Sequence, residues 1–282
     1  MLHPSKLLKE LGISPLKQLG QNFQVDVHSV ENAAAHIPSG GVILEIGPGL
    51  GAWTEVFLAR GHRMILVEKD RTLAARLKEK FSADERVQVH EGDVLEFDLN
   101  SPDFQTATAA VGNLPFYVTS EILLRLIVDC PRITHGLFGI QLEVAERIAS
   151  GKGSSLAIAL GAQGKLFMAG KISRNSFFPV PNVDAAILGF ERTTTLSRPH
   201  LRALLKAAFW GKRKTLASAL RKNPFWPEQA ETAAWPERLA SAPDELQPLL
   251  ALRADELNVA AFQRLYDYLE SGDVESGEIS YT

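Results

Sequence analysis

The chain has 282 residues and 45% hydrophobic content, enough for one large domain or two modest ones with a substantial core. Its formal net charge is −3, and it holds neither an apolar run near the ~20 residues of a membrane helix nor a signal-peptide core at its start. Cys130 is the only cysteine and the seven histidines are scattered, so we expect no intrachain disulfide, no metal site and a cytoplasmic protein.

The first strong pattern along the chain is a strand, a glycine-rich turn and a helix. Residues 42–46 (VILEI) form a short apolar run typical of a buried strand, and residues 52–60 have the pattern of a helix. Between them lie Gly47, Gly49 and Gly51, and glycines let the backbone approach a ligand closely. This order predicts a ligand-binding turn at the end of a buried strand.

Two further predicted strands lead into acidic residues. Residues 64–68 end at Glu68, about 20 residues after the glycine turn, where a carboxylate can bind both hydroxyls of a ribose. Residues 87–91 lead into Gly92 and Asp93, which is placed to meet an adenine edge. The spacing of these strand ends predicts an α/β sheet that binds a nucleoside.

Two ligands compete for the glycine turn. A dinucleotide site has the pattern G-x-G-x-x-G, but here the third glycine comes one residue early, Ala52 holds the last position and Pro48 stiffens the loop. S-adenosylmethionine has no pyrophosphate and carries a cationic sulfonium, which suits the acidic side chains of Glu45, Glu68 and Asp93. The pattern favours the methyl donor over a nicotinamide dinucleotide. Glu45 itself either caps the glycine turn or contacts the ligand.

The stretch 111–117 (VGNLPFY) is the most informative part of the chain. An adenine N6 amine is a poor nucleophile because its lone pair is delocalised into the ring, so it needs acceptors for its N–H bonds. The side-chain oxygen of Asn113 and the backbone carbonyl of Leu114, held by the peptide before Pro115, can be those acceptors. Phe116 then offers a flat face on which the base can stack. The alternative is a turn entering a helix, with Phe116 in the core.

Six motifs follow one another in the order in which one protein family carries them. They are residues 16–23, 45–51, 112–116, 143–148, 177–184 and 209–216. From residue 15 to about 223 the chain resembles the KsgA-type rRNA adenine N6,N6-dimethyltransferases, whose wider family includes the Erm enzymes and mitochondrial transcription-factor-B-like proteins. The resemblance implies a Rossmann-like class I S-adenosylmethionine-dependent methyltransferase domain followed by a small all-α domain. It also implies dimethylation of adenine N6 in small-subunit (16S) rRNA during ribosome biogenesis.

The resemblance implies two sets of site residues. The donor-binding set is Asn22, Gln24, Gly47, Glu68, Asp93 and Asn113. The set at the reacting amine is Asn113, Leu114, Pro115, Phe116 and Phe177.

Each of these residues has an implied role. Asn22 and Gln24 would contact the methionine end of the donor, and Gly47 would contact it through its backbone. Glu68 would hold the ribose and Asp93 the adenine amine. Asn113 would lie between donor and target, with the target base stacked between Phe116 and Phe177. Two alternatives stay open: Asn22 could cap a helix that starts near Val25, and Phe177 could belong to the core.

The chain departs from the family pattern at several positions. Gln24 stands where the family usually has Leu, Phe116 where bacterial members mostly have Tyr, and Val180 where they have Pro. The segment after Arg147 is shorter than is typical. Because that segment usually lies near the substrate, the sequence leaves substrate choice and the number of methyl groups more open than methyl transfer itself.

The distribution of charge predicts an RNA-binding surface despite the negative net charge. Residues 192–227 contain nine Lys or Arg and no acid, whereas residues 228–282 contain twelve acids and three bases. A one-signed block of this kind is typical of a surface that binds a phosphate backbone. The predicted RNA-binding residues are Lys212, Arg213, Lys214, Arg221 and Lys222. The alternative is a cationic helix paired with the acidic C-terminal segment.

The predicted elements divide the chain near residues 191–199. Strands are predicted at 133–141, in the apolar run from Leu156, at 165–173 and at 183–192, and helices at 201–210, 215–222 and 255–269. We therefore expect a methyltransferase domain at 1–192, a helical domain with the basic segment at 193–270 and a disordered acidic tail at 271–282.

Two other functions stay open. An Erm-like methyltransferase of large-subunit rRNA shares the core motifs, and a non-catalytic assembly or transcription factor could keep the fold as an RNA clamp. Glu68, Asp93 and Asn113 together favour an enzyme, and the N-L-P-F and F-x-P-x-P forms favour the small-subunit substrate. The expected partner is rRNA within an immature small ribosomal subunit, bound by a monomer without membrane or metal.

Overall fold

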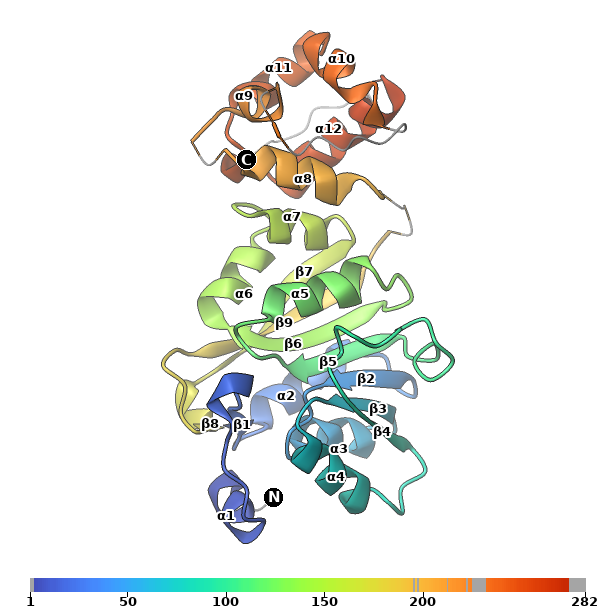
Figure 1. Ribbon diagram of the computed structural model, residues 1–282, viewed down its shortest axis with the longest axis vertical. Helices are drawn as coiled ribbons and strands as arrows, with labels where there is room; N and C mark the ends of the chain where they lie inside the picture. The colour runs from blue at the N-terminus through green and yellow to red at the C-terminus, as the bar shows by residue number, and fades with distance from the viewer. Residues whose placement is uncertain are drawn as a thin grey trace. The chain divides into compact units, whose positions relative to one another are not determined.

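The computed structural model describes residues 3–194, 196, 198–211, 213–221, 223–224 and 232–273 (Figure 1). The chain forms two compact units. The first is Met1–Glu146 with Lys165–Arg192, and the second is Arg147–Gly164 with Thr193–Thr282. Within the described residues no helix is both long and apolar enough to cross a membrane, and no three His, Cys, Asp or Glu side chains gather as a metal site.

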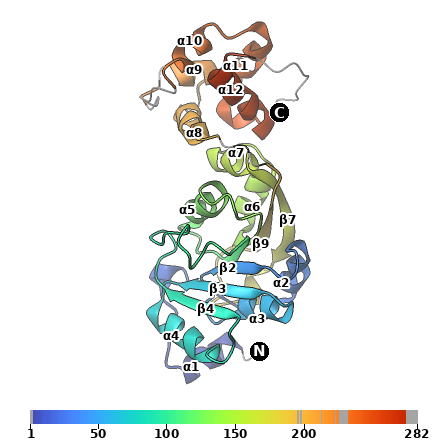
Figure 2. The same ribbon diagram turned by 90° about the vertical axis from the view of Figure 1, so that its right-hand side faces the viewer.

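A seven-stranded sheet forms the centre of the first unit. Its strands are β2 (Val42–Ile46), β3 (Arg63–Glu68), β4 (Val87–Glu91), β5 (Ala109–Asn113), β6 (His135–Gln141), β7 (Gly164–Ile172) and β9 (Ala185–Arg192). Their order in the sheet is β4-β3-β2-β5-β6-β9-β7. The first five are parallel to their neighbours, and β9 runs antiparallel to β6. Figure 2 shows β2, β3 and β4 side by side. The strands predicted near 42, 64, 87, 133, 165 and 183 are confirmed.

The strand order reverses between β2 and β5. From β2 the chain winds outward to β3 and β4, and then returns to place β5 on the other side of β2. Ligands of open α/β sheets bind at the carboxyl ends of the strands where the order reverses in this way. β2 and β5 are buried along almost their whole length, which explains their continuous apolar or small-residue sequences.

Short helices follow the strands of the first unit. They are α2 (His28–Ala33), α3 (Ala52–Ala59), α4 (Arg71–Lys80), α5 (Thr119–Leu123) and α6 (Leu142–Ala149). The Asp70 side chain caps α4 by accepting hydrogen bonds from the N–H groups of Thr72 and Leu73, at 2.9 and 3.2 Å. The helix predicted at 52–60 is confirmed as α3.

The N-terminal segment pairs with the F-x-P-x-P segment. After α1 (Pro4–Glu10), the two-residue strand β1 (Phe23–Gln24) pairs antiparallel with β8 (Phe177–Phe178). Two motifs about 150 residues apart in the sequence are therefore in direct contact. Leu8 of α1 packs in one apolar cluster with Phe23 and Phe178, which fixes α1 against this pair.

The second unit is helical. Its helices are α7 (Ser155–Gly161), α8 (Leu201–Phe209), α9 (Leu216–Arg221), α10 (Trp235–Ala240), α11 (Gln247–Ala251) and α12 (Val259–Ser271). Their core includes Leu204, Trp235 and Phe262, which are fully buried. The helix predicted at 255–269 starts only at Val259, because the Asn258 side chain caps it with a 3.0 Å hydrogen bond from the Ala261 N–H. Most of the predicted tail, 274–282, lies outside the described residues.

The prediction of a strand from Leu156 is wrong. The run is helix α7, and the Ser154 hydroxyl caps it by accepting a 3.2 Å hydrogen bond from the Ala157 N–H. A short apolar run does not distinguish a strand from a buried helix. The segment 147–164 groups with the C-terminal helices, although the predicted first domain, 1–192, includes it. The assignment of functions to the two parts stays a prediction.

Candidate active site

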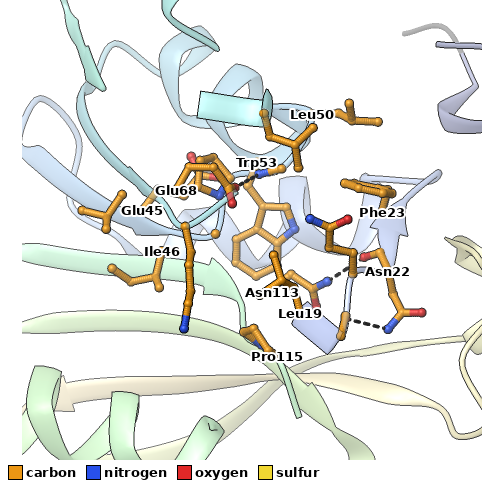
Figure 3. Close-up of a pocket in the computed structure, with 18 of the residues that line it drawn as sticks. Leu19, Asn22, Phe23, Glu45, Ile46, Leu50, Trp53, Glu68, Asn113 and Pro115 are labelled. Atoms are coloured by element: carbon orange, nitrogen blue, oxygen red, sulfur yellow. Dashed lines mark hydrogen bonds between the residues drawn. The ribbon is translucent and has the colours of Figure 1, made fainter. Parts of the chain in front are cut away.

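A pocket opens at the carboxyl ends of β2, β3, β4 and β5, beside the N-terminal segment (Figure 3). It brings together seven of the predicted site residues. These are Asn22, Gln24, Gly47, Glu68, Asp93, Asn113 and Pro115. These seven residues include the whole predicted donor-binding set, and their contact with a donor stays a prediction.

The glycine turn opens towards this pocket. Gly47 has a φ of +63°, and a Cβ built on it would have no atom within 4 Å. A side chain there would therefore be strained and would project into free space at the pocket wall. At Gly49, with a φ of +58°, a Cβ would lie 3.2 Å from the Phe23 ring. The turn thus depends on glycine for its backbone conformation at both positions and for close packing at Gly49.

Glu68 joins the end of β3 to the glycine turn. Its Oε2 accepts a 3.0 Å hydrogen bond from the Gly49 N–H, and its Oε1 accepts one of 2.9 Å from the Asp70 N–H. Burial raises the pKa of Glu68, although both hydrogen bonds act to lower it. Each carboxylate oxygen has two lone pairs, so the side chain keeps acceptor capacity for ligand hydroxyls.

Asp93 lies at the next strand end with a cationic neighbour. Its Oδ2 is 2.7 Å from Lys69 Nζ, and its Oδ1 accepts a 3.0 Å hydrogen bond from the Leu95 N–H. Partial burial acts to raise the pKa of Asp93, but these two hydrogen bonds outweigh it and leave the pKa below its ordinary value. Asp93 is therefore ionised at neutral pH and can accept from an amine.

Glu45 is the most deeply buried acid of the pocket. It is 1% exposed, and its Oε2 accepts a 2.6 Å hydrogen bond from the Thr54 hydroxyl of α3. Burial raises the pKa of Glu45 to about 8, and the nearby Glu68 adds to the rise. Its hydrogen bond goes to α3 rather than to the glycine turn. A cation bound in the pocket would stabilise the ionised form.

Asn113 ends β5 with its amide held in one orientation. Its Nδ2 donates a 3.1 Å hydrogen bond to the Asn22 carbonyl, while its Oδ1 is buried and has no hydrogen-bond partner. The Leu114 N–H is bound to the Gly139 carbonyl at 2.9 Å, and the Leu114 carbonyl accepts no hydrogen bond from the part of the chain that the structure describes. Asn113 lines the pocket and Leu114 does not, and each carries a carbonyl oxygen without a partner in the described part of the chain.

The Asn22 side chain stays within its own loop. It donates a 3.0 Å hydrogen bond to the Gly20 carbonyl, and the following helix α2 begins only at His28, with Val27 as its N-cap. Asn22 is therefore not a helix cap, and the alternative that it caps a helix near Val25 is wrong.

The two aromatic residues predicted to hold the target base lie in different surroundings. Phe116 is half-buried and is not one of the pocket-lining residues. Phe177 is 3% exposed and packs in the core with Ile172 and Ala185. Successive side chains of a strand point to opposite faces, so Phe177 enters the core while Phe178 turns to the other side. The structure therefore does not present Phe177 to a base, and the stacking of a base on Phe116 stays a prediction.

Comparison with known proteins decides the family. Residues 15–240 match the family described as ribosomal RNA adenine dimethylase. The chain is 35% identical over 275 residues to the ribosomal RNA small subunit methyltransferase A of Leifsonia xyli subsp. xyli, which covers 92% of this chain and 94% of that protein. The chain belongs to the ribosomal RNA adenine dimethylase family. A protein of the same description from Acidobacterium capsulatum is 35% identical over 267 residues and covers 90% of each chain.

Solved structures show the fold of this ribosomal RNA adenine dimethylase family member. A dimethyladenosine transferase from Plasmodium falciparum superposes with a TM-score of 0.71, 22% identity and coverage of 89% of this chain and 98% of that one. The 23S rRNA methyltransferase ErmE superposes with a TM-score of 0.66, 24% identity and coverage of 89% and 100%. The predicted family and the Rossmann-like methyltransferase fold with a helical C-terminal part are confirmed.

Two pocket contacts of this dimethylase family member were not predicted. Gln21 donates a 2.8 Å hydrogen bond to Asp70 Oδ2, which ties the N-terminal loop to the start of α4. The Trp53 indole donates a 2.7 Å hydrogen bond to Oε1 of Gln24. Gln21 lies within the 16–23 motif, which marks the segment but not its partner. Nothing in the sequence around Trp53 distinguishes it from an ordinary core residue.

Three of the predicted RNA-binding residues of this family member lie in the described structure, Arg213 and Lys214 between α8 and α9 and Arg221 at the end of α9. Arg213 and Arg221 are exposed, and Lys214 Nζ lies 3.7 Å from the centroid of the Trp210 ring. Lys212 and Lys222 lie outside the described residues. One cation of the basic block does pair with the acidic C-terminal segment, since Arg198 Nε is 3.1 Å from Asp267 Oδ1. RNA contact at the other positions stays a prediction.

Proposed function

We propose that this chain transfers methyl groups from S-adenosylmethionine to the N6 atom of adenine in rRNA of an immature small ribosomal subunit, twice at each adenine. The observation that carries the proposal is the buried, unpartnered Oδ1 of Asn113 at a pocket lined by acidic side chains. A buried acceptor without a partner is costly unless a ligand supplies the missing hydrogen bond. Family membership gives the class of ligand that would do so.

The pocket residues fit the methyl donor. Glu45 and Glu68 are buried acids whose ionised forms a cation would stabilise, and Gly47 leaves room for close approach to the backbone. Glu68 keeps lone pairs for the ribose hydroxyls, and ionised Asp93 suits the adenine amine. When bound, S-adenosylmethionine supplies a methyl group activated by the positive sulfonium.

Methyl transfer requires two contributions from the protein. It positions the donor and the base, and it supplies hydrogen-bond acceptors for the adenine amine. In the first transfer the Asn113 Oδ1 and the Leu114 carbonyl would accept hydrogen bonds from the two N–H groups of the adenine amine, so that the nitrogen becomes pyramidal and its lone pair leaves conjugation with the ring. In the second transfer one N–H remains, and one of these oxygens would accept its hydrogen bond. These acceptors stabilise the positive charge that develops on nitrogen as the nitrogen–methyl bond forms and the sulfur–methyl bond breaks. The resulting ammonium is acidic enough to lose its proton to water. No general base is needed.

The adenine has to leave its helix to reach the pocket, because a stacked base cannot present N6 to the donor. The basic residues of the second unit would hold the RNA through its phosphates while the base is extruded, with Arg213 and Arg221 exposed for this contact. We propose that the protein acts as a monomer in the cytoplasm.

Methylation of small-subunit rRNA is favoured over the two alternative functions, Erm-like methylation of large-subunit rRNA and non-catalytic RNA binding. The relatives at 35% identity over most of the chain are described as ribosomal RNA small subunit methyltransferase A, whereas the similarity to ErmE, at 24% identity, concerns the fold alone. A non-catalytic RNA clamp has no use for Glu68, Asp93 and Asn113 gathered at one pocket.

The direct test is tritium transfer from labelled S-adenosylmethionine to purified ribosomal subunits that lack adenine methylation. We expect label in immature small subunits, as N6,N6-dimethyladenosine after digestion, and background label in large subunits. Label confined to large subunits would establish the Erm-like activity instead. Binding of S-adenosylmethionine measured by calorimetry, with no transfer to either subunit, would favour the non-catalytic factor.

A further inference from the structure

Gly139 of β6 lies directly beside Asn113 in the sheet. The two residues are register partners in the parallel pair of β5 and β6, and the Leu114 N–H binds the Gly139 carbonyl at 2.9 Å. A Cβ built on Gly139 would lie 2.8 Å from the Asn113 Oδ1 and 3.3 Å from the Asn113 Cα. Real Cβ atoms do not come as close as 2.8 Å to another heavy atom. The Asn113 amide therefore occupies space that a side chain at position 139 would fill.

Trp53 of α3 bounds the same space. The Gly139 Cβ would also lie 3.3 Å from the Cζ2 atom of Trp53. This indole is 3% exposed and lines the pocket together with Asn113 (Figure 3). Its Nε1 is fixed by the 2.7 Å hydrogen bond to Gln24, so the ring cannot move aside without breaking a buried hydrogen bond. A side chain at position 139 would therefore press on two side chains of the pocket at once.

The orientation of the Asn113 amide depends on both of its ends. Its Nδ2 donates the 3.1 Å hydrogen bond to the Asn22 carbonyl, and its Oδ1 is buried without a partner in the space beside Gly139. If that space were filled, the amide would have to shift and its oxygen would point in another direction. Rates of this kind of reaction depend steeply on position, since a misplacement of about 1 Å can cost roughly 100-fold.

We propose that Gly139 is a positioning residue for methyl transfer, because its missing side chain leaves the space in which Asn113 holds its Oδ1 as an acceptor. The inference rests on the proposed function and adds to it a residue that does not itself line the pocket. Gly139 would thus act through Asn113 rather than on the donor or the base. In a purely structural role, Gly139 would only allow β5 and β6 to pack closely, and its replacement would lower stability without a specific loss of transfer.

The experiment compares Gly139→Ala with Gly136→Ala in the full chain. Gly136 is the matched control because it lies in the same strand, and a Cβ there would overlap the ring of Phe138. Since successive residues of a strand face opposite sides, Gly136 and Phe138 lie on the face away from that of Gly139. Tritium transfer to immature small subunits gives kcat and KM, calorimetry gives the Kd for S-adenosylmethionine, and urea denaturation gives the midpoint of unfolding.

Gly139→Ala should lower kcat about 10- to 100-fold and leave the donor Kd within about twofold. Gly136→Ala should lower the urea midpoint but leave kcat within about twofold. The double variant Asn113→Ala with Gly139→Ala should transfer no more slowly than Asn113→Ala alone, because the oxygen that the new methyl group displaces is already absent.

Unchanged kcat in Gly139→Ala, an equal loss in Gly136→Ala, or a further loss of the same size in the Asn113→Ala background would each overturn the positioning role. If Gly139→Ala does not fold, folding of the double variant would support the contact between position 139 and Asn113, and failure of both to fold would overturn it. A wild-type protein that labels no small subunits would remove the proposed function itself, while the urea midpoints of the single and double variants would still measure this contact.

Discussion

The indole Nε1 of Trp53 donates a 2.7 Å hydrogen bond to Oε1 of Gln24, and both side chains are buried at the wall of the pocket. The Nε2 of Gln24 also donates to the Asp26 carbonyl at 2.8 Å. The oxygen and the nitrogen of this side chain are therefore both hydrogen-bonded. It fixes the Trp53 ring next to β1 without contact with solvent.

Replacing Gln24 by Leu should leave the Trp53 N–H buried without an acceptor. We expect a loss of about 1–3 kcal/mol in the free energy of unfolding, measured by urea denaturation. Trp53→Phe removes the donor, so the double variant should be more stable than the sum of the two single effects predicts. Gln24→Leu removes the hydrogen bond to Asp26 in both backgrounds, wild type and Trp53→Phe, so the contribution of that bond to stability cancels in the comparison. Strictly additive effects would show that the indole contact contributes nothing to stability.

Replacing Asn113 by Ala should separate binding from chemistry. Donor affinity should stay largely intact, while transfer to small subunits should fall by ~100-fold or more, because one preorganised acceptor of the developing charge is lost. Asn113→Asp keeps an acceptor oxygen and should lose less. Asn32→Ala, on the exposed surface of α2, is the control. Near-normal turnover of Asn113→Ala would exclude the amine-acceptor role.

Glu45 should make stability depend on pH. Its pKa of about 8 in the folded protein exceeds the ordinary value of 4.5. The folded chain therefore keeps a proton that the unfolded chain releases, and this contribution to stability falls as pH rises from about 4.5 to about 8. Glu45→Gln, which stays neutral, should gain stability relative to wild type over that range by up to roughly 1.4 kcal/mol per pH unit.

Urea denaturation at pH 5, 6.5 and 8 measures this difference between the two proteins. Glu68, whose pKa is also raised, is present in both and largely cancels. Parallel pH curves for wild type and Glu45→Gln would mean that Glu45 is ionised throughout.

Lys212 and Arg213 should contribute to the dependence of RNA affinity on salt concentration. Replacing Lys212 and Arg213 by Ala removes two predicted phosphate contacts, and each should lower the magnitude of the log K against log salt slope by about 0.7 to 0.9. Lys214 is kept because its ammonium lies on the Trp210 ring, where its loss would also disturb packing. The loss should be similar for several RNA sequences, since phosphate contacts position without specifying.

The matched control for the Lys212 and Arg213 variant is the double variant Arg71→Ala and Lys78→Ala, which removes two exposed cations from α4. It should leave the slope nearly unchanged. Equal slopes for both double variants and wild type would show that RNA lies against another surface.

Features that depend on local sequence pattern could be predicted before the fold was known. Strand-like runs ending in Glu68 and leading into Asp93 identify two of the parallel strands, and positive φ values at Gly47 and Gly49 explain why glycine stands there. The N-L-P-F turn follows β5 as predicted, which brings Asn113 and Pro115 to the pocket. These features are set by neighbours in the chain, through strand periodicity, backbone conformation and the motif itself.

Which side chains the pocket presents depends on contacts between segments that are distant in the sequence. Pairing of β1 with β8 turns Phe177 into the core, burial keeps a proton on Glu45 at neutral pH, and Gln24 meets Trp53 across 29 residues of sequence. The run from Leu156 became a helix that belongs with the C-terminal unit. Burial, charge state and strand pairing arise from contacts between distant segments, and a pattern read along one chain does not contain those contacts.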